Sequence, residues 1–181
     1  MTLSPVSIIT GVQNNAGWAT NKYMTRNDLA KKFYGKTLEL GVAAGDFSNE
    51  ILNNERVDRH YAIDKWDDHH DIHEYLYALN RLACYKCLTI RARFSEALKL
   101  FEDSFFDCIY IDGYAHTGQN DGETLDSWWP KLKSGGIFSG HDYHNDWILT
   151  KTNVNKFIIK HSLRLFLTDD VKYPSWYIIK P

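Results

Sequence analysis

Short apolar runs alternate with amphipathic stretches along most of the chain. Helical patterns occupy residues 45–54, 71–82, 95–101, about 121–129 and about 150–161. Seven runs rich in β-branched and aromatic residues have the length of strands, and they span residues 37–41, 60–64, 87–91, 106–112, 136–140, 163–168 and 175–180. Helices separate the first five strands, which indicates βαβ units and a mostly parallel sheet covered by helices on both faces.

The two ends of the chain differ from this pattern. Only DDVKYP separates the last two strands, which is too short for a crossover helix and predicts an antiparallel hairpin. Before the first strand, TRNDLAKKFYG predicts a short helix with Asn27 or Asp28 as its cap and Gly35 as its stop. We therefore expect one α/β domain over residues 37–181. A cap segment over residues 1–36 precedes it, and its helix covers an end of the sheet or closes over a substrate.

The composition is that of a soluble globular domain. The chain has 181 residues, of which 44% are hydrophobic and 24% charged, and its net charge of -2 predicts no attraction to nucleic acid or anionic membranes. No apolar run reaches the roughly 20 residues of a membrane helix, and the first residues lack the pattern of a signal peptide. We expect a cytoplasmic protein, and its oligomeric state stays open.

The cysteines add little chemistry. Three cysteines cannot all pair, which indicates a reducing compartment. Cys84 and Cys87 form a C-x-x-C with no second pair or histidine partner at zinc-finger spacing. The pair is either a metal or redox motif or simply two small residues beside a strand.

A glycine-bounded turn follows the first strand. The chain passes from Gly41 to Gly45 through small residues before a helix starts, which permits a sharp turn and close approach of a ligand to the backbone. Neither G-x-G-x-x-G nor a phosphate loop ending in Gly-Lys-Ser/Thr is present, which disfavours a pyrophosphate or triphosphate ligand. Glu39, two residues before the first glycine, favours a ligand with a cationic end.

Further candidate ligand-binding residues lie at the ends of the next strands. Asp64 ends the second strand, where a carboxylate can accept both hydroxyls of a ribose. Lys65 comes next, and the indole of Trp66 can lie against an adenine ring. Ser95 stands at a predicted helix start, either as a ligand contact or simply as the N-cap. Together these features describe a ligand with adenine, ribose and a positively charged amino-acid moiety, which is S-adenosylmethionine.

Two of these stretches resemble a known family. LELGVAAGDFS and YAID resemble the first two motifs of class I S-adenosylmethionine-dependent methyltransferases. The stretch FDCIYIDGYAHTGQNDGETLDSWWPKLKSGGIFSGHDY is similar to small-molecule O-methyltransferase-like proteins related to macrocin O-methyltransferase and cephalosporin hydroxylase. The resemblance covers about residues 37 to 143. It implies a Rossmann-like, seven-stranded, mostly parallel sheet in the order 3-2-1-4-5-7-6, and methyl transfer to an oxygen of a small polar acceptor.

The resemblance also implies roles for individual residues. Glu39 would hold the methionine amino group through its surroundings, and Asp64 would bind the ribose. The loop from Gly41 through Ala43 to Gly45 would pass beneath the cofactor, and Ser95 and Glu96 would lie by the adenine. Lys65, Trp66 and Asp112, chosen for their places at the strand ends, complete the predicted cofactor-binding residues. In the family, the loop histidine usually stands one residue nearer to the Asp-Gly pair than His116 stands to Asp112 and Gly113. The extra residue reshapes the loop that faces the methyl group.

The reaction itself needs a group that acts on the acceptor. The sulfonium is already activated, so the enzyme mainly aligns the acceptor and removes its proton with a base or a metal ion. Asp112 ends the fourth strand and Asp142 follows the fifth, so they meet at one edge and can hold Mg²⁺. His141 stands where metal-binding relatives often carry an acid, which weakens a hard-cation site or makes His141 the base. Asp112, His141 and His116 are therefore the catalytic candidates, whereas Tyr143 and His144 are expected to pack.

Several alternatives stay open. A methyltransferase for RNA or a protein side chain would use a modest basic patch formed by Lys22, Arg26, Lys31, Lys32 and Lys36. A binding module that keeps the cofactor pocket without turnover, and a metal-dependent hydroxylase like the cephalosporin relative, are further possibilities. His69 and His73 could bind zinc, although the acids around them also suit a helix start with no ligand.

Overall fold

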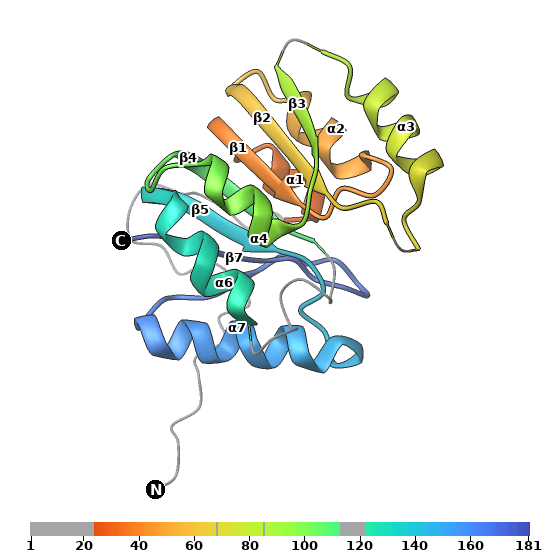
Figure 1. Ribbon diagram of the computed structural model, residues 1–181. Coiled ribbons are helices and arrows are strands. Elements are labelled where there is room, and N and C mark those ends of the chain that lie inside the picture. Colours follow the sequence, from red (N-terminus) through yellow and green to blue (C-terminus); the bar gives the residue numbers. More distant parts are fainter. Residues whose placement is uncertain (1–23, 68, 85, 113–121) are drawn as a thin grey trace, which may run out of the picture.

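One seven-stranded sheet forms the centre of the protein. The computed structural model describes residues 24–67, 69–84, 86–112 and 122–181 (Figure 1). The strands are β1 (Gly35–Leu40), β2 (Val57–Asp64), β3 (Cys87–Arg91), β4 (Phe106–Ile111), β5 (Leu132–Gly140), β6 (Phe166–Leu167) and β7 (Trp176–Ile179). Their order is β3-β2-β1-β4-β5-β7-β6, and only β7 pairs antiparallel, with both of its neighbours. The Rossmann-like sheet and its C-terminal hairpin are therefore confirmed.

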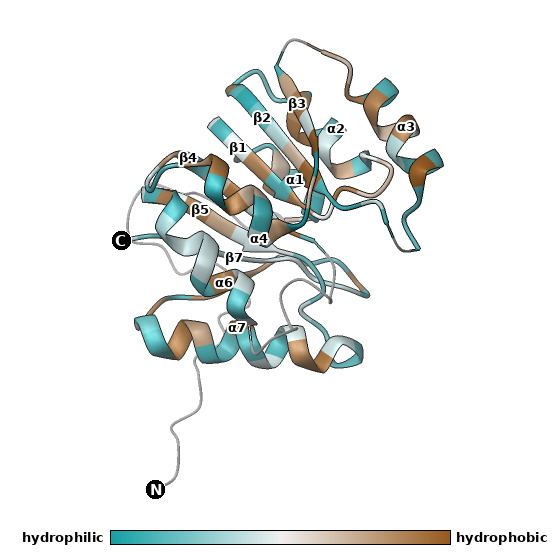
Figure 2. Ribbon diagram, viewed as in Figure 1, coloured by the Kyte–Doolittle hydropathy of each residue, from teal (hydrophilic) through white to brown (hydrophobic). Residues whose placement is uncertain are grey.

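Helices cover both faces of this sheet. They are α1 (Arg26–Ala30), α2 (Asp46–Leu52), α3 (Ile72–Arg81), α4 (Phe94–Ala97), α6 (Glu123–Trp128) and α7 (Ile148–His161). Alternate residues of β4 separate the two faces: Ile109 packs in a core cluster with α6 and α7, whereas Tyr110 packs with α1 and α2. Figure 2 shows apolar and polar residues alternating along α7, as expected for a helix with one face against the sheet.

The N-terminal helix begins earlier than the sequence predicts. Thr25 is its N-cap: the Thr25 hydroxyl accepts from the Asp28 backbone N–H, and the Asp28 carboxylate accepts from the Thr25 backbone N–H. The predicted caps at Asn27 and Asp28 are therefore wrong, because this reciprocal pair satisfies the first backbone donors two to three residues earlier. Gly35 is not the helix stop either, since α1 ends at Ala30 and Gly35 begins β1.

The cysteines are all free. Cys84 is exposed and Cys87 opens β3, and burial raises the pKa of Cys87 to about 11. Burial also raises the pKa of Cys108 to about 12. Cys87 and Cys108 are therefore thiols at neutral pH, and the thiolate is the reactive form of cysteine. The interpretation of the C-x-x-C as residues beside a strand fits this placement.

None of the helices in the described parts of the chain is long and apolar enough to cross a membrane.

Candidate functional site

The parallel strands bring the candidate residues to one edge of the sheet. Backbone hydrogen bonds continue the sheet register beyond the strand ends: Gly41 N–H donates to the Ile63 carbonyl at 2.9 Å, and Asp112 N–H donates to the Leu40 carbonyl at 2.8 Å. The His141 N–H likewise donates to the Ile111 carbonyl at 3.0 Å. The residues that follow β1, β4 and β5 therefore lie side by side, at the edge where open α/β sheets bind ligands.

The glycine loop turns over the end of β1. Gly41 and Gly45 have φ angles of 91° and 82°, in the left-handed region that glycine takes at low cost. Asp64 holds this loop in place, because one of its carboxylate oxygens accepts from the backbone N–H groups of Val42 at 2.8 Å and Ala43 at 3.0 Å. Its other oxygen accepts from the Lys65 N–H at 2.6 Å. Asp64 thus positions the loop, while its expected contact with a ribose stays a prediction.

Trp66 supports the same loop from the core. Its side chain is 1% exposed, and its Nε1–H donates to the Ala43 carbonyl at 2.9 Å. The ring packs against Tyr75, with the ring centroids 4.7 Å apart, in a cluster that includes Val42 and Leu82. The expected contact between this indole and an adenine ring is therefore wrong for this structure, because neither ring face is open to a ligand.

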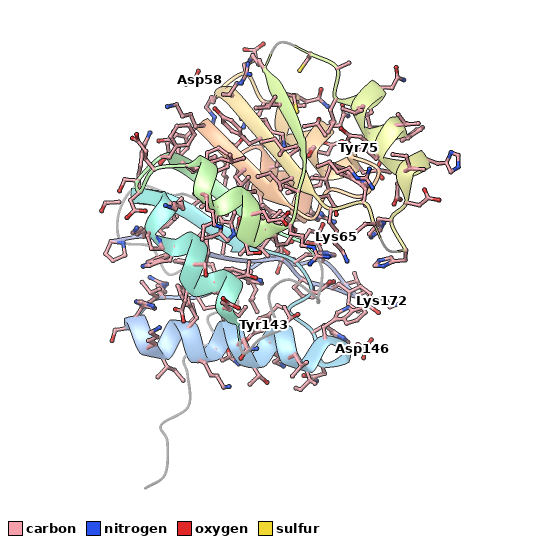
Figure 3. All side chains as sticks on the ribbon, in the orientation of Figure 1. Asp58, Lys65, Tyr75, Tyr143, Asp146 and Lys172 are labelled. Carbon is pink, nitrogen blue, oxygen red and sulfur yellow. The ribbon has the colours of Figure 1, made fainter. Side chains whose placement is uncertain are left out.

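The remaining adenine-side candidates lie on the surface. Lys65 pairs with Asp67 at 3.2 Å, and Figure 3 shows it at the carboxyl end of β2. Ser95 is exposed inside α4, which begins at Phe94, so it is not the N-cap. Nothing in their contacts opposes a role beside a cofactor, and that role stays a prediction.

Glu39 belongs to a buried polar network that the sequence did not reveal. The Ser48 hydroxyl donates to the Glu39 carboxyl group, and His60 Nε2 lies 3.0 Å from the Ser48 oxygen. Thr37 closes the chain of bonds, 2.8 Å from His60 Nδ1. Burial, reinforced by the charge of Asp112, raises the pKa of Glu39 to about 8, and burial lowers the pKa of His60 to about 3. Both groups are therefore mostly uncharged at neutral pH.

The alternation of β-strand residues is the signal that could have revealed this network. Thr37 and Glu39 are two apart on β1, as His60, Ala62 and Asp64 are on β2, so each set lies on one face. His60 pairs in register with Thr37. A polar residue on this face of one strand needs a partner on the next, because an unpaired buried polar group is costly.

Asp112 and His141 form the centre of the site. His141 Nδ1 lies 3.5 Å from one Asp112 oxygen and 3.0 Å from Asp142 Oδ1, and the other Asp112 oxygen accepts from the Arg26 guanidinium. Burial alone would raise the pKa of Asp112, but Arg26 and His141 lower it. Burial alone would lower the pKa of His141, but its bonds to the two carboxylates raise it to about 9. At neutral pH the ionised Asp112 therefore lies between the guanidinium of Arg26 and the imidazolium of His141.

The same three residues have the arrangement of metal ligands. One ligand atom each from Asp112, His141 and Asp142 lie within 4.8 Å of one another. No other such group occurs in the described ranges, so the histidines near the start of α3 do not form one there. There, Asp71 caps α3 by accepting from the His73 and Glu74 N–H groups, as the alternative without a ligand predicts.

The rest of the loop after β5 is structural. Tyr143 is 5% exposed and its hydroxyl donates to the Asn155 side chain at 2.8 Å on α7 (Figure 3). His144 caps the next turn, accepting from the Asp146 N–H at 3.2 Å. Both are placed as expected. The other catalytic candidate, His116, lies outside the described residues.

Comparisons with known proteins agree with this geometry. A family model described as a methyltransferase domain matches residues 38–143. No curated protein is similar enough to the chain to be matched. Among solved structures, a putative caffeoyl-CoA O-methyltransferase from Staphylococcus aureus is 16% identical over 84% of this chain and 82% of its own, with a TM-score of 0.64.

Two further solved structures share the fold. Precorrin-6y C5,15-methyltransferase from Geobacter metallireducens is 16% identical, with coverage of 90% of this chain and 93% of its own and a TM-score of 0.65. Spermidine synthase from Thermotoga maritima is 19% identical over 86% of this chain, with a TM-score of 0.62, and the chain spans only 57% of that protein's length. At these identities the likeness shows the fold alone.

Proposed function

The chain belongs to the methyltransferase domain family, and on that premise we propose that it transfers a methyl group from S-adenosylmethionine to an oxygen of a small polar acceptor. The family and the fold imply S-adenosylmethionine or an analogue as the cofactor. The observation that carries the choice of oxygen is the cluster of Asp112, His141 and Asp142 beside the glycine loop. An alcohol must lose its hydroxyl proton when it attacks a methyl group. This cluster offers a carboxylate that can accept the proton, and ligands for a metal ion that can displace it.

We assign proton removal to Asp112 rather than to His141. Asp112 is ionised, and its carboxylate lies at the carboxyl end of β4 between the residues that follow β1 and β5. As the acceptor oxygen bonds to the methyl carbon, the electron pair of the carbon–sulfur bond stays on sulfur and the hydroxyl proton passes to the carboxylate. His141, with a pKa raised to about 9, already carries its proton and stabilises the negative charge that develops on oxygen. The role of His116 stays a prediction.

A divalent cation fits the same residues. Asp112, Asp142 and His141 would hold it, and when bound it would lower the pKa of the acceptor hydroxyl. Imidazole nitrogen suits Mn²⁺ or Zn²⁺ better than Mg²⁺, which prefers oxygen ligands. The cation would have to displace the His141 proton and share Asp112 with Arg26. A requirement for Mg²⁺ stays a prediction, and proton removal by Asp112 does not depend on it.

Methylation of RNA gains no support from the surface charges. In the expected basic patch, Arg26 points at Asp112 and Lys31 pairs with Asp28 at 2.9 Å. Lys22 lies outside the described residues. These pairs reduce the positive field that a phosphate backbone would need.

S-Adenosylhomocysteine is expected to bind the full chain in a calorimetric titration and to raise its thermal unfolding temperature. At a ligand concentration of 100 times Kd the stabilisation should be about 2.7 kcal/mol. ATP is the matched control and should not bind, because the loop lacks the residues that hold a triphosphate. No heat and no thermal shift at millimolar S-adenosylhomocysteine would contradict the proposed cofactor.

Cofactor binding is also expected to release a proton from Glu39. The pKa of Glu39 is raised to about 8 by burial and by Asp112, so this carboxyl group is largely protonated at neutral pH. The ammonium group of the cofactor, held near it, favours the ionised form. The affinity for S-adenosylhomocysteine should therefore increase as the pH rises toward 8 and level off above it. Calorimetry in two buffers with different ionisation enthalpies measures the released proton directly.

Glu39→Gln supplies the control for this linkage. Glutamine still accepts from Ser48 but cannot lose a proton, so the buffer dependence should disappear. An affinity of the unchanged chain that does not vary with pH would rule out the assignment to Glu39.

A further inference from the structure

Helix α1 is tied to the far end of the sheet. The Arg26 backbone N–H donates to Asp170 at 2.8 Å, and the Met24 N–H donates to Asp169 at 2.9 Å. The Asp169 N–H in turn donates to the Met24 carbonyl at 2.7 Å, so the start of α1 is held by the connection between β6 and β7. These bonds and the Thr25 cap fix the backbone from which the Arg26 side chain extends.

The Arg26 side chain lies on two aromatic rings. Its guanidinium carbon is 4.2 Å from the ring centroid of Phe47 and 5.2 Å from that of Tyr110. One nitrogen donates to Asp112, which fixes the direction of the planar group. The side chain remains 25% exposed. Such an arrangement holds a cation rigidly at little entropic cost when a ligand arrives.

This guanidinium keeps donors for a ligand. It has five N–H groups. Its Nε is buried and, within the described part of the chain, has no hydrogen-bond partner. A buried donor without a partner is costly, and a ligand that accepts from it recovers that cost. The geometry of the fork matches a carboxylate.

The position of Arg26 indicates which carboxylate it would bind. Phe47 lies in the first turn of α2, directly after the glycine loop over which the methionine part of the cofactor would pass. The Asp112 carboxylate, which pairs with Arg26, lies at the same edge and would repel a second carboxylate. A cation that neutralises Asp112 and faces the loop removes this repulsion. The Glu39 carboxyl group remains for the ammonium end.

We propose that Arg26 binds the carboxylate of the methionine moiety of S-adenosylmethionine while it keeps its ion pair with Asp112. This inference rests on the proposed function, since it needs the same cofactor. It assigns the N-terminal helix a part in the cofactor site, beyond covering an end of the sheet. It also links cofactor binding to the residue that acts on the acceptor, because one guanidinium contacts both.

Two ligands separate the carboxylate from the rest of the cofactor. S-Adenosylhomocysteine carries the carboxylate, and S-adenosyl-3-thiopropylamine keeps the ammonium group but lacks it. We expect Arg26→Met to raise the Kd of S-adenosylhomocysteine by about 10- to 100-fold. The Kd of the amine should change by less than about twofold. Arg26→Lys should recover part of the loss, because it keeps the charge without the fork.

Lys31→Met is the matched control, since it removes a cation from the C-terminal end of the same helix, where Lys31 pairs with Asp28. It should leave both affinities unchanged. Equal weakening of both ligands by Arg26→Met would mean that Arg26 only shapes the loop, and no weakening of either would remove it from the site; both overturn the inference. If the unchanged chain binds neither ligand, the proposed function fails as well. Thermal unfolding of each variant shows whether the fold is intact.

Discussion

Asp112→Asn is expected to lower kcat for methyl transfer by about 10²- to 10⁴-fold, the range for loss of a positioned proton acceptor. The amide keeps the shape of the side chain but cannot take the proton of the acceptor hydroxyl. It also loses the charge that pairs with Arg26 and His141. The measurement is S-adenosylhomocysteine formation with a hydroxylated acceptor found by screening small molecules against the unchanged chain.

Asp103→Asn is the control for this substitution. Asp103 is an exposed carboxylate that pairs with Lys131 at 2.7 Å, away from the reaction edge, and its variant should keep full activity. If Asp112→Asn retains activity within about twofold of the unchanged chain, Asp112 is not the group that removes the proton, because loss of a general base costs far more than twofold.

The same assay with a chelator, and with Mg²⁺ or Mn²⁺ restored, tests the metal proposal. Activity that survives chelation contradicts the proposal.

Trp66→Ala is expected to reduce the free energy of unfolding by about 3–5 kcal/mol, the usual cost of emptying a buried tryptophan site. The side chain is 1% exposed and fills the space between the glycine loop and α3. The variant also loses the bond from the indole to the Ala43 carbonyl. Urea unfolding followed by circular dichroism gives the change, as a shift of the midpoint at constant m-value.

Trp66→Phe separates packing from the hydrogen bond. Phenylalanine keeps much of the apolar contact but leaves the Ala43 carbonyl without its donor, so we expect a smaller loss of about 1–3 kcal/mol. Both variants should also bind S-adenosylhomocysteine more weakly, because Ala43 belongs to the loop that would lie beneath this ligand. If Trp66→Ala changes stability by less than about 1 kcal/mol, far under the cost of a filled core site, the indole does not support the loop.

The protonation of His141 changes how the site is interpreted. The sequence offered this residue as a base, because histidine ordinarily titrates near neutral pH. In the structure its Nδ1 lies between two carboxylates, 3.0 Å from Asp142 and 3.5 Å from Asp112. The pKa of about 9 that results makes it a proton donor in the neutral range. The adjacent residues in sequence suggested a cluster, but only their distances decide which member holds the proton.

Most secondary structure followed from local pattern. The third strand has the predicted bounds, residues 87–91, because a short apolar run between turn residues has few other ways to pair. The sixth strand is shorter than the predicted residues 163–168 and spans only Phe166–Leu167. As an edge strand it extends only as far as its single neighbour, β7, pairs with it. The cap at Thr25 was missed because Asn27 and Asp28 are equally good caps by composition. The reciprocal bond between Thr25 and Asp28 decided the start.

The sequence by itself determined which edge of the sheet carries the candidate residues. Parallel strands end at one edge, so residues in the last positions of β1 and β2, or directly after β4 and β5, come to that edge. Glu39, Asp64, Asp112 and His141 could therefore be placed there without coordinates. The glycine spacing also predicted the turn after β1. It depends on backbone conformation within five residues, from Gly41 to Gly45.

Only the tertiary structure decided what each of these residues contacts. Arg26 looked like part of a surface patch, but α1 folds it onto Phe47 and Tyr110 and against Asp112, 86 residues away. Trp66 looked like an adenine platform, but it fills the core beneath the loop. Burial and ion pairing depend on neighbours that are distant in the chain. Periodicity can assign a side chain to a face, whereas its charge state and its partner follow from packing across that face.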